Sequence, residues 1–219
     1  MTFADQPKQR NRSATEARIL EAARRVIARD GFTGFGVNSV AAEAGCDKKL
    51  ITRYFGGIDG VLRAVAGDAS FWLAEMPPEG PFETYPDFIL ALAVGYQKLL
   101  KNNPVLQRVL AWELVEQSET LQQIEDVRSK ALMAWVSQAR GDRKPPPGVD
   151  APVLIAMLTG AMRYLTLAKA TLGQSAGVDL TKPENEARVN AAFARLIRLA
   201  FSEDPVQPEI GALQAILKK

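Results

Sequence analysis

Three residues at a fixed spacing, Ala41, Gly45 and Ile51, constrain the N-terminal part of this chain most strongly. Two short helices that cross steeply need a small residue where their backbones approach, and Ala41 is small. The turn between them needs a residue that tolerates positive φ, as Gly45 does, and the second helix needs an apolar anchor, such as Ile51. The spacing therefore predicts a helix-turn-helix over residues 37–55.

The surrounding residues fit the same arrangement. A preceding helix is expected to start at Thr15 as its cap and to end at Gly31, where a C-terminal cap belongs. Asp47 is a good N-cap for the second helix of the motif. The apolar side chains expected in the shared core are Val40, Ala44, Cys46, Ile51 and Phe55, with Tyr54 partly exposed. The pattern thus predicts a small head of three helices over residues 15–57. A basic, flexible tail is expected at residues 1–14.

The remainder, residues 58–219, is predicted to be a larger body made of helices. It has no run of alternating β-branched residues and no Asn-Gly or Asp-Gly hairpin signal. Helices are expected near 59–75, 84–102, 104–116, 118–140, 150–173, 184–202 and 209–218. Segment 141–150 is expected to be an exposed, mobile loop, and 173–185 is a second loop. The predicted fold class is all-α, with a three-helix head fused to a helical-bundle body.

The absence of histidine among 219 residues removes the commonest general base and the commonest ligand of catalytic zinc. We therefore expect no enzyme, no catalytic residue, no metal and no cofactor. The single cysteine, Cys46, excludes an intramolecular disulfide. It is expected to pack as a small hydrophobe, although an exposed thiol of low pKa would allow a redox switch instead. No apolar run approaches the roughly 18 to 20 residues that span a bilayer, and the first residues lack the apolar stretch of a secretory signal, so neither a span nor a signal is expected. A cytoplasmic protein without membrane contact is expected.

Charge is distributed unevenly between the head and the body. Residues 1–63 contain 11 Lys/Arg and 7 Asp/Glu, which gives +4, whereas residues 64–219 contain 16 and 18, which gives −2. A basic head on an acidic body favours a polyanionic partner for the head, and a helix-turn-helix makes double-stranded DNA that partner.

Residues 19–65 resemble the N-terminal DNA-binding region of TetR-type transcriptional regulators. The shared features are the Ile-Leu-x-Ala-Ala opening, Gly31-Phe32, Val40-Ala41, Ala44-Gly45, Lys48 and the close at Tyr54-Phe55. The segment at 103–116 resembles a stretch common in the bodies of these regulators. The resemblance implies a homodimer on a palindromic operator and a body that binds a small effector.

Within this resemblance, residues 48–55 are the recognition helix. The residues expected to contact DNA are Asn38, Lys48, Lys49, Leu50, Thr52, Arg53 and Tyr54. Asn38 can pair with adenine and Leu50 can pack against a thymine methyl. Several positions depart from the family pattern, which indicates an unusual operator, and a solvated basic helix face is the plain alternative. The tail cations Lys8, Arg10 and Arg12 are candidates for phosphate or minor-groove contacts.

In the body, the resemblance implies a four-helix dimer interface formed by residues 150–173 and 184–201, although the same apolar stripes could instead close the monomer core. Residues proposed to line an effector pocket are Trp72, Phe88, Tyr96, Trp112, Glu116, Trp135 and Met162. Glu113 and Glu116 are possible partners of a cationic effector. The predicted function is that of a repressor released from its operator by a small, largely apolar effector. The alternative is a DNA-binding regulator whose body binds a partner protein.

Overall fold

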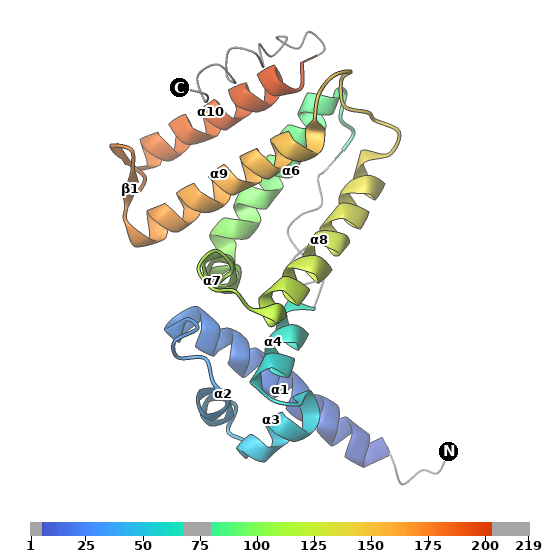
Figure 1. The fold of residues 1–219 in the computed structure, drawn as a ribbon, viewed down its shortest axis with the longest axis vertical. Coiled ribbons are helices and arrows are strands. Elements are labelled where there is room, and N and C mark those ends of the chain that lie inside the picture. The colour runs from blue at the N-terminus through green and yellow to red at the C-terminus, as the bar shows by residue number, and fades with distance from the viewer. Residues whose placement is uncertain (1–5, 68–79, 203–219) are drawn as a thin grey trace.

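The computed structural model describes residues 6–67 and 80–202. Over these residues all regular secondary structure is helical apart from one two-stranded hairpin, which confirms the predicted all-α class. The head lies at one end of the elongated molecule and the body at the other (Figure 1).

The head consists of α1 (Gln6–Asp30), α2 (Val37–Ala44), α3 (Lys48–Phe55) and α4 (Ile58–Ala66). α1 starts at Gln6, so residues 6–14, which the sequence analysis assigned to the basic tail, are helical. Arg12 Nε donates to Glu16 Oε1 at 2.7 Å, an i,i+4 pair that supports this extra length. Thr15 is no cap, because its hydroxyl donates to the Asn11 carbonyl at 2.8 Å. The side chains of Lys8 and Arg10 lie outside the described part.

The helix-turn-helix has the predicted geometry. Gly45 closes α2 in the left-handed conformation with φ 60°, and its neighbour Cys46 donates its backbone N–H to the Ala41 carbonyl at 3.0 Å. Ile51 is fully buried together with residues of α1, α2 and α4. Cys46 and Phe55 pack against this cluster but are only half-buried. The sequence therefore placed the anchor correctly and overestimated the burial of two of its neighbours.

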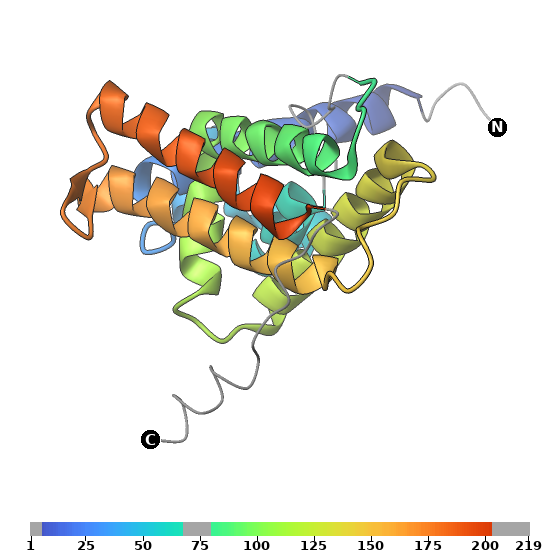
Figure 2. The same cartoon turned by 90° about the horizontal axis from the view of Figure 1, so that it is seen from above.

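The body contains α6 (Tyr85–Asn102), α7 (Pro104–Glu113), α8 (Glu119–Arg140), α9 (Ala151–Thr171) and α10 (Pro183–Ala200). Three of these helices begin with side-chain caps that accept a backbone N–H, namely Thr84, Asn103 and Asp150. Seen from above, α6, α9 and α10 run alongside one another (Figure 2). Their buried faces share one core that also takes in α7 and α8.

The two loops predicted in the body are more ordered than expected. The segment at 173–185 contains an antiparallel hairpin, β1 (Gln174–Ser175) and β2 (Val178–Asp179). The loop at 141–150 is anchored to the body, because Pro146 is buried and Arg143 Nη2 donates to the Phe82 carbonyl at 3.2 Å. The predicted helix at 209–218 and the end of the predicted helix at 59–75 lie outside the described residues.

The head and body are joined by packed side chains as well as by the chain itself. α1 packs on α7 and α4 packs on α8. Ile27 and Leu62 of the head belong to the buried core of the body. The ring of Phe32 stacks on Trp112 with centroids 3.5 Å apart and planes 26° apart. A displacement of α7 or α8 would therefore reach the head directly.

One helix in the described part, α9, is long and apolar enough to cross a membrane, with a mean hydropathy of 1.4 in its most apolar window. This corrects the expectation that no segment approaches that composition. Only 17% of that window is buried, and Val153, Met157 and Tyr164 are each more than half exposed. The composition alone is weak support for a membrane span, because helices that pack in a soluble protein can share it.

Candidate nucleic-acid interface and effector cavity

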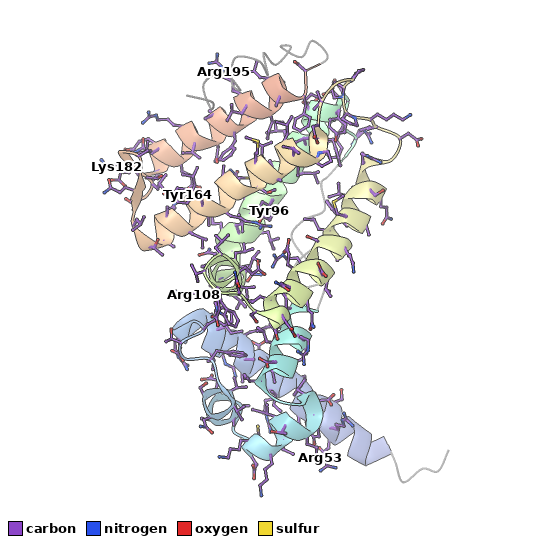
Figure 3. All side chains as sticks on the ribbon, viewed as in Figure 1. Arg53, Tyr96, Arg108, Tyr164, Lys182 and Arg195 are labelled. Atoms are coloured by element: carbon purple, nitrogen blue, oxygen red, sulfur yellow. The ribbon has the colours of Figure 1, made fainter. Side chains whose placement is uncertain are left out.

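The exposed face of α3 carries four of the seven residues predicted to contact DNA. Asp47 caps the helix by accepting the Lys49 backbone N–H at 2.8 Å. The exposed side chains of this face are Lys48, Lys49, Thr52 and Arg53. At 100° per residue these four lie within one side of the helix, opposite the buried Ile51. Arg53 projects from the head at the end remote from the body (Figure 3).

Leu50 and Tyr54 lie at the edge of this face. Both are half-buried and pack against the core of the head, so neither side chain is fully presented to solvent. The Arg12 guanidinium lies over the Tyr54 ring, 5.2 Å from its centroid. This contact joins the unpredicted N-terminal part of α1 to the recognition helix and brings one predicted tail cation to its side.

Asn38, the remaining predicted contact, is exposed in the first turn of α2. Ser39 fixes the start of that helix, because its hydroxyl donates to the Gly34 carbonyl at 2.7 Å and accepts the Gly36 backbone N–H at 3.0 Å. The side chain of Asn38 is therefore carried on a firmly capped helix end, next to the recognition helix.

Two arginines of α1 pair with one carboxylate of α2. Arg25 Nε donates to Glu43 Oε1 at 2.8 Å and Arg29 Nη1 donates to Glu43 Oε2 at 2.9 Å. These hydrogen bonds, that from Arg25 first, lower the pKa of the Glu43 carboxyl below its ordinary value. The arginines thus tie α1 to α2 and hold the helix-turn-helix on its supporting helix.

A small cavity of about 70 Å³ lies in the body between α6, α8 and α9. Its walls are almost wholly apolar and include Tyr96 and Met162, two of the predicted pocket residues, together with Leu132, Val136 and Ile155. Tyr96 lies in the middle of the body, far from the recognition helix (Figure 3). An apolar enclosure with a single phenol fits a largely apolar ligand.

The other predicted pocket residues have different surroundings. Phe88 is fully buried in the core of the body, and Trp135 packs against that core without lining the cavity. Trp112 stacks on Phe32 and donates its indole N–H to Glu116. Trp72 lies outside the described residues. Glu113 accepts two hydrogen bonds from Arg128, at 2.7 and 2.8 Å, so its charge is already matched and it is a poor receptor for a cationic effector.

Comparison with known proteins matches residues 19–65 to the family described as bacterial regulatory proteins, tetR family. This segment contains α3 and the core that supports it. Over residues 19–65 the chain is similar to the regulators of this family, and the match does not extend over the body. The family is described as regulatory proteins.

Two curated relatives extend the likeness beyond the head. The HTH-type transcriptional repressor SCO4008 of Streptomyces coelicolor is 34% identical over 109 residues, which cover 49% of this chain. The HTH-type transcriptional regulator BetI of Vibrio vulnificus is 28% identical over 129 residues, which cover 55% of this chain. The matched parts span 53% and 64% of the relatives' own lengths.

Solved structures of two regulators named FadR align with most of this chain. FadR from Bacillus subtilis, crystallised with stearoyl-CoA, aligns with a TM-score of 0.61 and 20% identity, over 85% of this chain and 98% of the other. FadR from Bacillus halodurans aligns with a TM-score of 0.57 and 19% identity, over 84% and 94%. At such identities the likeness establishes the arrangement of the helices in this chain and nothing beyond the fold.

Sequence reasoning missed three features of these sites. The Arg12–Tyr54 contact depends on α1 extending past Thr15, for which the Arg12/Glu16 spacing was the available signal. The contact between Phe32 and Trp112 joins residues eighty positions apart and left no local signal. The same holds for the pairing of Glu113 with Arg128.

Proposed function

We propose that this chain is a sequence-specific DNA-binding transcriptional regulator of the TetR type that places α3 in the major groove. The observation that carries the proposal is the single exposed face of α3, formed by Lys48, Lys49, Thr52 and Arg53, on a helix whose other face anchors the head. Cations and a hydroxyl on one face supply phosphate contacts and base contacts together. The protein acts where the chromosome lies, in the cytoplasm.

The DNA-binding proposal predicts steep salt dependence. We expect Lys49→Gln to weaken binding to all DNA sequences and to reduce the slope of log affinity against log salt by about 1, because one phosphate contact is lost. The measurement is a fluorescence-anisotropy titration at several salt concentrations, using operator DNA selected from random duplexes. Lys144→Gln, an exposed lysine of the 141–150 loop, is the charge-matched control and should change neither quantity. Salt-independent binding, or equal effects of both variants, would contradict the proposal.

We also propose that two copies associate through α9 and α10. Val153, Met157 and Tyr164 on α9 and Leu196 and Leu199 on α10 expose more than half of their surfaces in the single chain. On each helix these positions follow helical spacing, and so they form continuous apolar stripes. Burying such stripes against their own copies around a two-fold axis gives a closed dimer, which suits a palindromic operator.

The dimer proposal predicts that Met157→Asp produces monomers, because a carboxylate would be buried against an apolar partner. Light scattering coupled to gel filtration should show the mass falling from two chains to one, with DNA affinity falling in parallel. Leu114→Asp changes an equally exposed apolar residue in the turn between α7 and α8 and should leave the mass unchanged. A Met157→Asp protein that keeps the dimer mass would exclude this interface.

For regulation, we propose that a small, largely apolar effector enlarges the cavity between α6, α8 and α9 and thereby releases the repressor from DNA. The cavity of about 70 Å³ is smaller than a typical ligand site of about 300 to 1,000 Å³, so binding requires its walls to move apart. α8 packs on α4 and α7 packs on α1, so such movement would shift both heads. A change in head separation breaks the register with successive major grooves. One structural neighbour holds stearoyl-CoA, which agrees with an apolar ligand in this fold.

A further inference from the structure

A second, larger hollow lies on the other side of the α6–α9 pair from the cavity. It is a groove of about 700 Å³ between α6, α9 and α10, and it opens to solvent. Met162 lines both the groove and the cavity, and is the wall that the two share. The size falls within the range of about 300 to 1,000 Å³ that small-molecule sites occupy.

The groove is amphiphilic along its length. Leu165 of α9 and Val189 and Phe193 of α10 form an apolar floor. Lysines line the end next to the β1–β2 hairpin: Lys101 comes from the last turn of α6 and Lys169 from the last turn of α9. Lys98 lies one turn before Lys101 on the same face of α6. An apolar floor thus leads to a cationic end.

The positive charge at this end exceeds what the groove itself neutralises. Of the ionisable residues that line it, three are lysines and one is Glu186, which leaves two positive charges in excess. The Glu186 carboxylate accepts from Lys169 Nζ at 2.7 Å and from Lys101 Nζ at 3.1 Å. These bonds, that from Lys169 first, lower the pKa of Glu186. Each ammonium has three N–H donors, so both lysines keep donors for a second anion.

On α9, the groove and the proposed dimer interface occupy different faces of the helix. Met162, Leu165 and Lys169 face the groove. Met157 and Tyr164, which belong to the proposed dimer interface, lie roughly 140° to 160° away from Met162 around the helix at 100° per residue. On α10, Leu196 of that interface lies roughly 60° from Phe193, so a partner chain borders the α10 side of the groove while the α9 side stays clear.

We propose that this groove binds a small amphiphile with an anionic head group and a hydrocarbon chain. The head group bonds to Lys98, Lys101 and Lys169, and the chain lies over Leu165, Val189 and Phe193 toward Met162. A neutral apolar molecule would leave the lysines unmatched, whereas a small inorganic anion would leave the apolar floor in water. This site is distinct from the effector cavity, and occupancy reaches that cavity through the Met162 side chain.

The test is isothermal titration calorimetry on the DNA-free, full-length protein. Decanoate, kept below its micelle-forming concentration, is the anionic probe, decyltrimethylammonium is the cationic probe and acetate is the short-chain probe. Decanoate should bind at least tenfold more tightly than either of the others. Equal binding of decyltrimethylammonium would overturn the role of charge, and equal binding of acetate would overturn the role of the chain.

Substitutions of groove residues test whether decanoate binds in the groove. We expect Lys98→Gln/Lys101→Gln to weaken decanoate binding by about tenfold or more, because two charge-assisted contacts are lost. Val94→Gln, at an exposed position on the groove wall, should weaken it severalfold through the lost apolar contact. Lys144→Gln should have no effect. Unchanged affinity in the double variant would place the ligand elsewhere and overturn the proposal. Since no DNA is present, that failure would leave the DNA-binding proposal intact.

Discussion

Replacing Arg128 by alanine is expected to destabilise the protein by about 3 to 5 kcal/mol, the usual cost of removing one partner of a buried ion pair. The Arg128 and Glu113 side chains are only 8% and 12% exposed, and two hydrogen bonds join them. Glu125, one turn before Arg128 on α8, also pairs with the guanidinium but is 43% exposed and can be solvated by water. Arg128→Ala therefore leaves the buried carboxylate of Glu113 without a cationic partner, which is expected to cause most of the loss of stability.

The measurement is urea unfolding followed by far-UV circular dichroism, at fixed protein concentration because association affects stability. Arg128→Met/Glu113→Leu removes both charges and should recover most of the stability lost in Arg128→Ala. Arg198→Ala is a matched control, since Arg198 is 64% exposed and lies 3.5 Å from Asp87; we expect a change below about 1 kcal/mol. If Arg128→Ala were as mild as the control, the pair would contribute little to the body.

The Arg128–Glu113 ion pair lies on body helices that contact the head, so its removal is also expected to affect DNA binding. Glu113 ends α7, next to Trp112, which stacks on Phe32 of the head. Arg128 belongs to α8, which packs on α4 of the head. The ion pair thus joins α7 to α8, two body helices that contact the head. Arg128→Met/Glu113→Leu, although stable, is expected to weaken the response of DNA binding to an effector.

The head was predictable because its determinants are local. Ala41, Gly45, Asp47 and Ile51 lie within eleven residues, and each acts on the backbone or the core beside it. The burial of Leu50 and Tyr54 was harder to predict, because it depends on how deeply α3 settles on α1 and α4. The sequence pattern could therefore identify the helix-turn-helix but could not set the exact edges of the exposed face of α3.

The helices of the body could be predicted from the sequence, but the positions of its pocket and groove residues could not. Aromatic residues were selected as pocket candidates by their type, and Trp112 instead contacts the head while Trp135 packs on the core. The groove lysines come from helices sixty-eight residues apart in sequence, at Lys101 and Lys169, and meet only when α6 and α9 pack. Such sites follow from helix crossing, which hydrophobic periodicity does not specify.

Replacing Gly60 by alanine is expected to destabilise the head by about 3 kcal/mol, toward the upper end for overpacking, because the obstructing atoms belong to backbone. A Cβ at Gly60 of α4 would overlap the carbonyl oxygen of Phe55, the last residue of α3. That carbonyl cannot move unless the end of the recognition helix moves with it. DNA affinity should therefore fall together with thermal stability.

The sign of the change in stability distinguishes this steric effect from the effect of helix propensity. Propensity alone would make a glycine-to-alanine change in a helix stabilising by about 0.8 to 1 kcal/mol. Gly160→Ala tests that term at a protein concentration low enough to keep the chain monomeric, since nothing lies within 4 Å of the added Cβ on α9 in the single chain and Gly160 belongs to the proposed dimer stripe. Thermal unfolding by circular dichroism should show Gly160→Ala unchanged or more stable and Gly60→Ala less stable. A Gly60→Ala protein with raised stability and full DNA affinity would mean that α3 and α4 are not packed this closely, and that the recognition helix is free to shift without cost to the head.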